Sequence, residues 1–366
     1  GLDHAQELHG PYSVPWHINE YTEHLKSKGL LKPFLDDICK RFREGDFTVV
    51  EPAPIPPEDH ADAYIGRQAI DYIKRHPADK PMFLIVSFPG PHSPFDAPGE
   101  YGEMFKPEDM ILPPNVPELI QGQYDRDHVR RAQANYYGKI KLIDDWIGNI
   151  VDAQRERGKW RETLSIFTAD HGELMGSHGR FSKCGFQDES AGIPMIVRWP
   201  TDPDGDDKSI QRGATSDALV ELIDVYATVI DAAGGQTAKG TFGRSLIPFA
   251  NNPNAPFRDT ALSEIGHGPH LNYMARNQRY KWFSMCGKEF FYDMLEDPYE
   301  TNNLIDESNH QGELQRLREQ CRQKVAQTQV NDAADYESLF KRIAKVSDGT
   351  DIGDYFQAKF QDLHFS

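Results

Sequence analysis

The feature that most constrains this sequence is a short apolar run that leads into a carboxylate and an imidazole. Residues 164–167 are apolar enough to form a buried strand, and Asp170, His171 and Gly172 follow within a few positions. Neighbouring side chains on a regular strand point to opposite faces, so Asp170 and His171 could not share a ligand there. A glycine beside the strand end lets the backbone turn, and both side chains can then converge on one divalent cation. The bare triplet is equally compatible with a turn that only ends a strand.

A second buried run leads to another candidate side chain. Residues 82–88 form a continuous apolar run that predicts a parallel strand, and a loop rich in proline and glycine follows it. That rigid loop would present His92, although on the loop alone a solvated histidine is the more common outcome. Lys183 follows Asp170 and His171 in the same loop, close enough to bring a cation to an anionic substrate. Open α/β sheets bind ligands beyond the carboxyl ends of their strands, so both loops are candidate sites.

Apolar residues at helical spacing surround these two runs. Helices are predicted over residues 18–43, 59–76, 126–157 and 218–233. Asp59 is the predicted N-cap of the second of these helices. Helices that alternate with buried strands predict an α/β fold, with a mostly parallel central sheet flanked by helices.

The pattern changes near residue 251, after which short alternating runs predict an antiparallel sheet followed by a helix. The alternating runs cover residues 259–264, 270–276, 280–285 and 289–292, and the polar amphipathic helix covers 313–327. We therefore expect an α/β domain over residues 1–250, an antiparallel-sheet subdomain over 251–330 and a tail over 331–366. The tail mixes charged residues with Phe and Tyr, and one interpretation is an arm that packs on a second copy in a homo-oligomer.

The charge balance narrows the classes of ligand. The 366 residues include 57 Asp and Glu against 40 Lys and Arg, a net charge of −17 with no basic stripe, which argues against nucleic-acid binding. No apolar run approaches the ~20 residues of a membrane span. A sulfated or phosphorylated substrate would meet an unfavourable overall field, so its binding would need a metal ion and local cations. The four cysteines include no C-x-x-C pair and predict free structural thiols.

The motifs around the carboxylate and imidazole together resemble a known family. They are TADHGE at residues 168–173, GSHG at 176–179, Lys183, and IPMIVRWP at 193–200. This series resembles the second signature block of the sulfatases, which belong to the alkaline phosphatase superfamily. The resemblance implies that Asp170 and His171 bind one divalent metal ion, with Ca²⁺ favoured and Mn²⁺ or Mg²⁺ as alternatives. It also implies that Lys183 contacts the sulfate group, and that His92, in the similar pattern H-x-P-x-x-x-P, lies beside the sulfate ester.

The family's nucleophile motif is not present in these residues. Sulfatases convert a Cys or Ser in C/S-x-P/A-x-R to formylglycine, and the segment from Cys39 to Arg43 has Arg41 where the motif needs Pro or Ala. We interpret that segment as a chance match. The first residues, GLDHAQEL, are similar to the segment that follows the first lobe of sulfatases, so formylglycine, the first strand and further acidic ligands are expected upstream of residue 1. Residues 1–366 alone should then be inactive on sulfate esters, bind metal weakly and aggregate through an exposed strand edge.

The resemblance implies metal-dependent hydrolysis of a sulfate ester, either a small molecule or a sulfated saccharide. The metal ion and Lys183 would neutralise charge on the transferring group, and His92 or Lys183 would orient a sulfate oxygen or protonate the leaving alcohol. A phosphonate monoester or phosphodiester hydrolase of the same superfamily is an alternative that His171 also suits. A binding protein that keeps the fold without the nucleophile is a third. A periplasmic or secreted location is expected, with the cytoplasm as the alternative.

Five other side chains near these motifs are less informative. Tyr136, Tyr137 and Lys139 are interpreted as core or surface residues of the helix that precedes the Asp-His strand. His267 and His270 could reach the substrate as specificity residues, but surface positions are expected for both.

Overall fold

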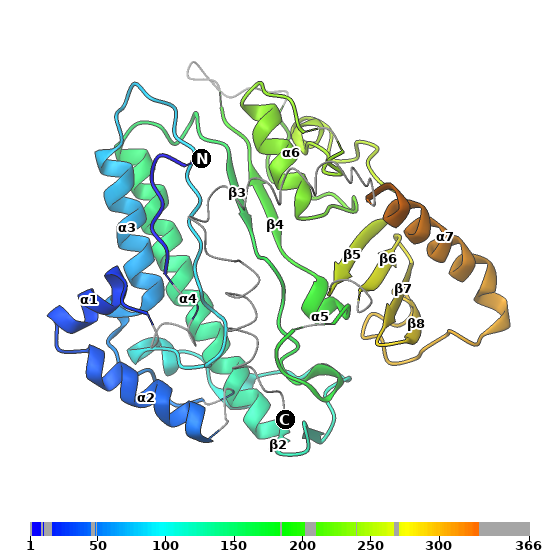
Figure 1. Cartoon of the computed structure of the whole chain (residues 1–366), viewed down its shortest axis with the longest axis horizontal. Coiled ribbons are helices and arrows are strands. Elements are labelled where there is room, and N and C mark those ends of the chain that lie inside the picture. The colour runs from blue at the N-terminus through cyan, green and yellow to red at the C-terminus, as the bar shows by residue number, and fades with distance from the viewer. Residues whose placement is uncertain are drawn as a thin grey trace, which may run out of the picture.

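The computed structural model describes residues 2–8, 10, 17–44, 48, 50–183, 185–201, 210–238, 240–266 and 271–328. The predicted tail over 331–366, together with His267 and His270, lies outside the described residues. Figure 1 shows helices α3 and α4 on one side, strands β3 and β4 in the middle, and the sheet β5–β8 with α7 on the other side. None of the described helices has both the length and the low charge needed to cross a bilayer.

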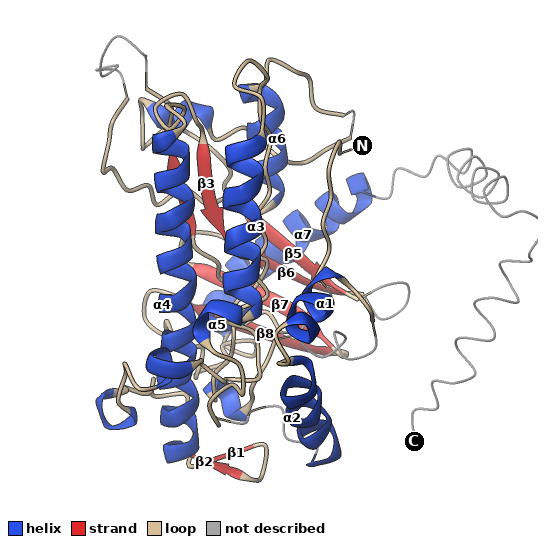
Figure 2. Cartoon of the chain, turned by 90° about the vertical axis from the view of Figure 1, so that its left-hand side faces the viewer, coloured by secondary structure: helices blue, strands red, loops and turns tan. Residues whose placement is uncertain are grey.

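The N-terminal part of the chain forms helices in the predicted ranges 18–43, 59–76 and 126–157, and the first of these is divided into two helices. Its helices are α1 (Glu20–Ser27), α2 (Leu31–Glu44), α3 (Ala61–Arg75) and α4 (Arg126–Glu156). The long helices α3 and α4 lie side by side (Figure 2) and approach closely where Gly66 faces Trp146, since a Cβ on Gly66 would lie 2.6 Å from the indole. The predicted N-cap of α3 was wrong. His60 caps the helix by accepting from Asp62 N, while the buried Asp59 carboxylate is already bound to His24 and Lys28 from α1 and its end.

Short elements connect the helices and strands. They are β1 (Leu119–Ile120), β2 (Tyr124–Asp125), α5 (Asp188–Ala191), α6 (Ile223–Ala232) and the 3-10 turns Pro57–Asp59, Gly99–Gly102, Pro107–Asp109, Ser177–Gly179, Ile247–Ala250 and Ser308–His310. An aromatic and aliphatic core lies between the start of α4 and the loop that carries Lys183, and it includes Phe95, Val129 and Phe181.

The central sheet differs from the expected one in the described part of the chain. The strand predicted at 164–167 is β3 (Ser165–Thr168), and it pairs antiparallel with β4 (Met195–Arg198) in the register Ser165 to Arg198. The described residues contain no parallel pair, and 82–88 is not assigned as a strand. Side chains along 82–88 still alternate between exposed and half-buried, as they do on an extended chain with one uncovered face. The apolar run predicted an extended segment correctly, but it could not show whether a second strand lies close enough to pair with it.

The C-terminal antiparallel sheet was predicted correctly. Its strands are β5 (Ala261–Ile265), β6 (Asn272–Arg276), β7 (Tyr280–Met285) and β8 (Lys288–Asp293), in sequential order, and the helix that follows is α7 (Gln311–Thr328). One face of the sheet packs Ala275, Trp282 and Phe291 against α7. The opposite face packs Phe283 against the buried Phe186, which follows the Lys183 loop in the chain. The sheet therefore supports the segment that carries the candidate site.

Candidate active site

The side chains of Asp170 and His171 converge just beyond the end of β3. Asp170 Oδ2 lies 3.5 Å from His171 Nε2, while Asp170 Oδ1 accepts a hydrogen bond from the His171 backbone N–H at 2.9 Å. His171 Nδ1 lies 2.7 Å from the carbonyl oxygen of Gly172. A carbonyl oxygen only accepts, so Nδ1 carries the proton and the lone pair of a neutral ring is on Nε2, next to the carboxylate. This arrangement presents one oxygen and one nitrogen ligand from the same turn.

Gly172 makes this turn possible. Its N–H donates to Ser190 O at 2.7 Å, which joins the turn to helix α5. A Cβ at position 172 would lie 2.1 Å from the backbone oxygen of Glu189 and 3.2 Å from that of Gly192. No side chain fits at this distance, so the close contact with α5 requires glycine here.

His92 and Lys183 meet at the second part of the site. Lys183 Nζ lies 2.8 Å from His92 Nε2, and His92 Nδ1 lies 2.7 Å from Ser93 O. An ammonium group only donates, so His92 Nε2 accepts and the ring proton sits on Nδ1. Burial lowers the pKa of His92, the hydrogen bond to Ser93 O opposes this, and the electrostatic influence of Lys183, Lys139 and His171 lowers the pKa further. The imidazole is therefore neutral near pH 7, and His171 lies close enough to influence it.

A partly buried carboxylate that the sequence analysis did not assign holds the Lys183 loop. Glu173 accepts hydrogen bonds from the backbone N–H of Met175 and of Ser182, the residue before Lys183. Burial raises the pKa of Glu173, and its hydrogen bonds and the charges of Lys183 and His171 oppose that rise. Glu173 stands inside the quoted TADHGE motif, so the motif contained a signal for it. A backbone-anchoring role cannot be deduced from residue type alone.

Two other features of the described chain do not suit the anionic substrate that the sequence predicts. His178, Glu189 and Glu300 place ligand atoms within 4.8 Å of one another, but the fully buried Lys281 ammonium lies 2.7 Å from Glu300 Oε1 and already supplies positive charge. Lys281 also lies 2.7 Å from Asp188 Oδ1 on α5. The cluster therefore joins α5 to the C-terminal sheet as a network of salt bridges.

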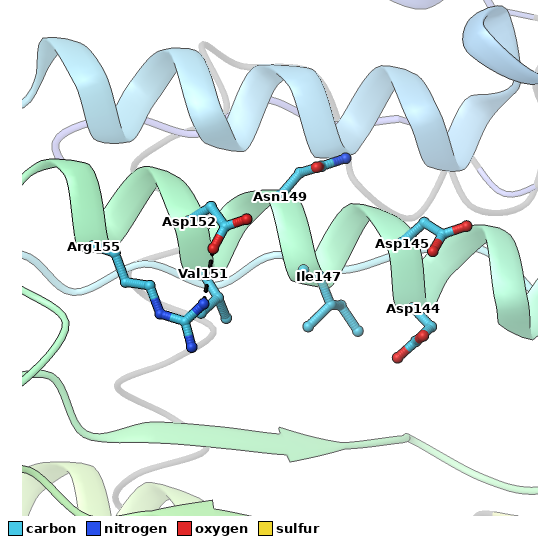
Figure 3. Close-up of a pocket in the computed structure, with 8 residues that line it drawn as sticks. Asp144, Asp145, Ile147, Asn149, Val151, Asp152 and Arg155 are labelled. Carbon is cyan, nitrogen blue, oxygen red and sulfur yellow. Dashed lines mark hydrogen bonds and ion pairs between the residues drawn. The ribbon is translucent and has the colours of Figure 1, made fainter.

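The second feature is a cavity of about 410 Å³ along α4 (Figure 3), and none of the four candidate residues lines it. It is lined by Asp144, Asp145, Ile147, Gly148, Asn149, Val151, Asp152 and Arg155. The arginine, its one cation, is paired with Asp152 at 2.8 Å. Carboxylates that outnumber cations in this way repel a sulfate group.

The described chain is an α/β protein with a carboxylate–imidazole pair after β3 and a lysine–histidine pair that joins two loops. Residues 1–235 match the family model described as Sulfatase, which covers all four candidate side chains. Residues 176–328 match the model described as N-sulphoglucosamine sulphohydrolase, C-terminal, which covers the antiparallel sheet and α7. The chain belongs to the sulfatase family.

Individual relatives agree with this assignment. The arylsulfatase of Clostridium perfringens is 31% identical over 71% of this chain and 56% of its own length. The crystal structure of the phosphonate monoester hydrolase of Agrobacterium radiobacter superposes with a TM-score of 0.69 at 22% identity, over 84% of this chain and 69% of that one. A protein solved in complex with its substrate D-glucosamine-2-N,6-O-disulfate gives a TM-score of 0.60 at 19% identity, over 75% of this chain and 71% of that one. The predicted alkaline-phosphatase-like fold class is therefore confirmed. The chain spans about half the length of the curated relatives it matches.

Proposed function

We propose that this chain forms part of an enzyme that hydrolyses sulfate esters with the help of a divalent metal ion. The observation that carries the proposal is the meeting of Lys183 Nζ and His92 Nε2 at 2.8 Å, near the converged side chains of Asp170 and His171. The four groups come from two loops distant in sequence, and the electrostatic influence of His171 on His92 supports the proposal that they face one region. The name of the Clostridium perfringens relative, an arylsulfatase, supports the choice of substrate class.

Asp170 and His171 supply some, but not all, of the ligands that a divalent cation needs. Asp170 offers a carboxylate oxygen and His171 a lone pair on Nε2, a pair of ligands that suits a hard or borderline cation. The Asp170 side chain is 83% exposed, which leaves space for a cation and for further ligands beside it. Two ligands are too few to hold such an ion tightly, so we propose that other acidic residues outside 1–366 complete the set. Ca²⁺ is proposed on the family resemblance, with Mn²⁺ and Mg²⁺ as alternatives.

We place the nucleophile, a formylglycine, outside residues 1–366 as well. Cys39 lies in α2, where the buried Arg41 two residues on forms an ion pair with Asp37. The uncovered side chains of Phe83 (57% exposed), Ile85 (68%) and Phe167 (44%) support a further strand between 82–88 and β3. Such a strand would cover these apolar groups and bring its carboxyl end to the site.

Residues of this chain would stabilise the negative charge of the transition state and donate a proton to the leaving group. The bound metal ion would supply electrophilic stabilisation of the sulfate group. Lys183 would exchange its contact with His92 for a sulfate oxygen and hold that oxygen as negative charge develops. His92 is neutral with Nε2 unprotonated in this structure, so it must gain a proton there before it can protonate the leaving alcohol. The negative charge of an arriving sulfate ester favours that protonation.

Parallel assays with an aryl sulfate and an aryl phosphonate monoester test the proposal and its runner-up. Hydrolysis of the phosphonate with no turnover of the sulfate would support the alternative function, which the fold shared with phosphonate monoester hydrolase also suits. The chain supplied with the polypeptide that precedes residue 1 should hydrolyse the aryl sulfate, and chelation should stop it. Residues 1–366 alone should be inactive. Metal-dependent turnover by residues 1–366 alone would show that the nucleophile lies within them.

A chain with the upstream polypeptide that binds a sulfated saccharide but turns over neither ester would instead be a binding protein. Location in the periplasm or outside the cell, the three-part domain division and assembly into a homo-oligomer stay predictions.

A further inference from the structure

Lys139 is a buried lysine whose partners all lie in the loop that carries His92. It stands in the middle of α4 and is only 3% exposed. Its ammonium lies 2.9 Å from His92 O, 3.0 Å from Pro94 O and 3.3 Å from Asp96 Oδ1. Lys139 was interpreted from the sequence as a core or surface residue. The structure shows that it is a core residue, and that its ammonium group reaches a loop more than 40 residues away in the chain.

The cost of burying this group argues for a specific role. Moving an ammonium ion out of water costs several kcal/mol even after relaxation, and a methionine would fill the same volume without that penalty. The three acceptors offset the cost, and two of them are backbone carbonyls on either side of Ser93. The ammonium group therefore fixes the path of the backbone through His92, Ser93 and Pro94.

Helix α3 holds the same loop at a second point. The fully buried carboxylate of Asp62 accepts a hydrogen bond from Gly90 N–H at 2.9 Å, just before His92 in the chain. Gly138, which precedes Lys139, lets α4 approach closely, because a Cβ there would lie 2.2 Å from Tyr101 O. Two packed helices thus clamp the loop at points before and after the imidazole.

We propose that Lys139 is a positioning residue, which holds the backbone at His92 so that the imidazole meets Lys183 and the sulfate group. This inference rests on the proposed function of His92. The competing explanation is that Lys139 only neutralises the buried Asp96, in which case the two carbonyl contacts would be incidental. The two explanations differ in what happens when both charges are removed together.

The test compares Lys139→Met, the double variant Lys139→Met/Asp96→Asn and the control Lys141→Met. Lys141 is a partly exposed lysine two residues along the same helix, paired with Asp145. Lys139→Met alone leaves Asp96 buried without its closest cation and can fail to fold. The double variant removes that unpaired charge but still lacks the donor to the loop carbonyls, so it isolates the positioning role.

Turnover of an aryl sulfate is measured on the chain supplied with its upstream polypeptide, together with hydrogen exchange of the amides at 89–97. We expect the double variant to unfold at nearly the parent temperature, to lose kcat by on the order of 10²-fold with a smaller change in KM, and to exchange about tenfold faster in the loop. Lys141→Met should match the parent in all three.

Several results would overturn the inference. A double variant with parent kcat and parent exchange would show that Lys139 serves only Asp96, and one that does not fold would show that the lysine is needed for folding itself. If the parent protein does not turn over sulfate esters, the proposed function fails, but the exchange comparison still decides whether Lys139 holds the loop.

Discussion

Replacing Gly172 by alanine should damage the candidate metal site far more than an alanine on an ordinary surface of the protein. The new Cβ would lie 2.1 Å from Glu189 O, whereas ordinary contacts begin at 3.4 Å, so the turn and α5 must separate by about 1 Å or more. The hydrogen bond from Gly172 N–H to Ser190 O, now 2.7 Å long, would stretch or break. His171, one residue earlier, would move with the turn.

The expected size of the effect follows from these contacts. Overpacking of this kind costs about 1–3 kcal/mol, and a lost hydrogen bond adds about 0.5–1.5 kcal/mol. We therefore expect Gly172→Ala to lower the free energy of unfolding by about 2–4 kcal/mol in a urea titration. Displacing a metal-binding side chain should also lower metal affinity by roughly 10–100-fold, as changes in supporting contacts do.

Gly148→Ala is the matched control. Gly148 lies in α4, and a Cβ there meets nothing within 4 Å, so alanine should stabilise the helix by about 0.5–1 kcal/mol. If Gly172→Ala matched Gly148→Ala in stability and metal affinity, the close approach of the turn to α5 would not be what sets the position of His171.

Three further predictions concern the site residues. Asp170→Asn should weaken Ca²⁺ or Mn²⁺ binding in a calorimetric titration. The substitution should change the free energy of unfolding without metal by less than about 0.5 kcal/mol, because the Asp170 side chain is 83% exposed. An unchanged metal affinity would show that Asp170 is not a metal ligand. Lys183→Met should cut aryl sulfate turnover by on the order of 10²–10³-fold while the protein stays folded, and near-normal turnover would make Lys183 a bystander. Because burial lowers the pKa of His92, the unfolded chain takes up the extra proton first as the pH falls through about 6.5. The stability that His92 contributes is thus present above that pH and lost below it. His92→Gln should therefore reduce the fall in the free energy of unfolding between pH 7 and 5. Equal slopes of unfolding free energy against pH in the parent and the variant would contradict this.

Local patterns predicted the elements whose stability depends on local contacts. The long helix α4 was predicted from helical spacing, and its N-cap is Asp125, which accepts from His128 N–H at 2.7 Å. The four alternating runs after residue 251 became β5–β8 because each strand pairs with its neighbour in sequence. The convergence of Asp170 and His171 was predictable because a glycine follows them at the end of a strand.

Contacts between distant segments were not predictable in the same way. The run 82–88 has the composition of a buried strand, but composition does not identify the partner it pairs with. Asp59 looked like an N-cap, yet its carboxylate is bound to two cations near α1, more than 30 residues earlier in the chain. Lys139 is one of two lysines on α4, and only the tertiary fold shows which of them reaches the His92 loop.

The proposed metal site can be tested directly with an anomalous difference map from crystals grown with millimolar Mn²⁺, using the chain together with its upstream polypeptide. We predict a peak within coordination distance of Asp170 Oδ2 and His171 Nε2, with Lys183 and His92 facing the same space. A peak at His178, Glu189 and Glu300 with none beside Asp170 and His171 would contradict it, because the cation would then lie in the cluster that Lys281 already neutralises.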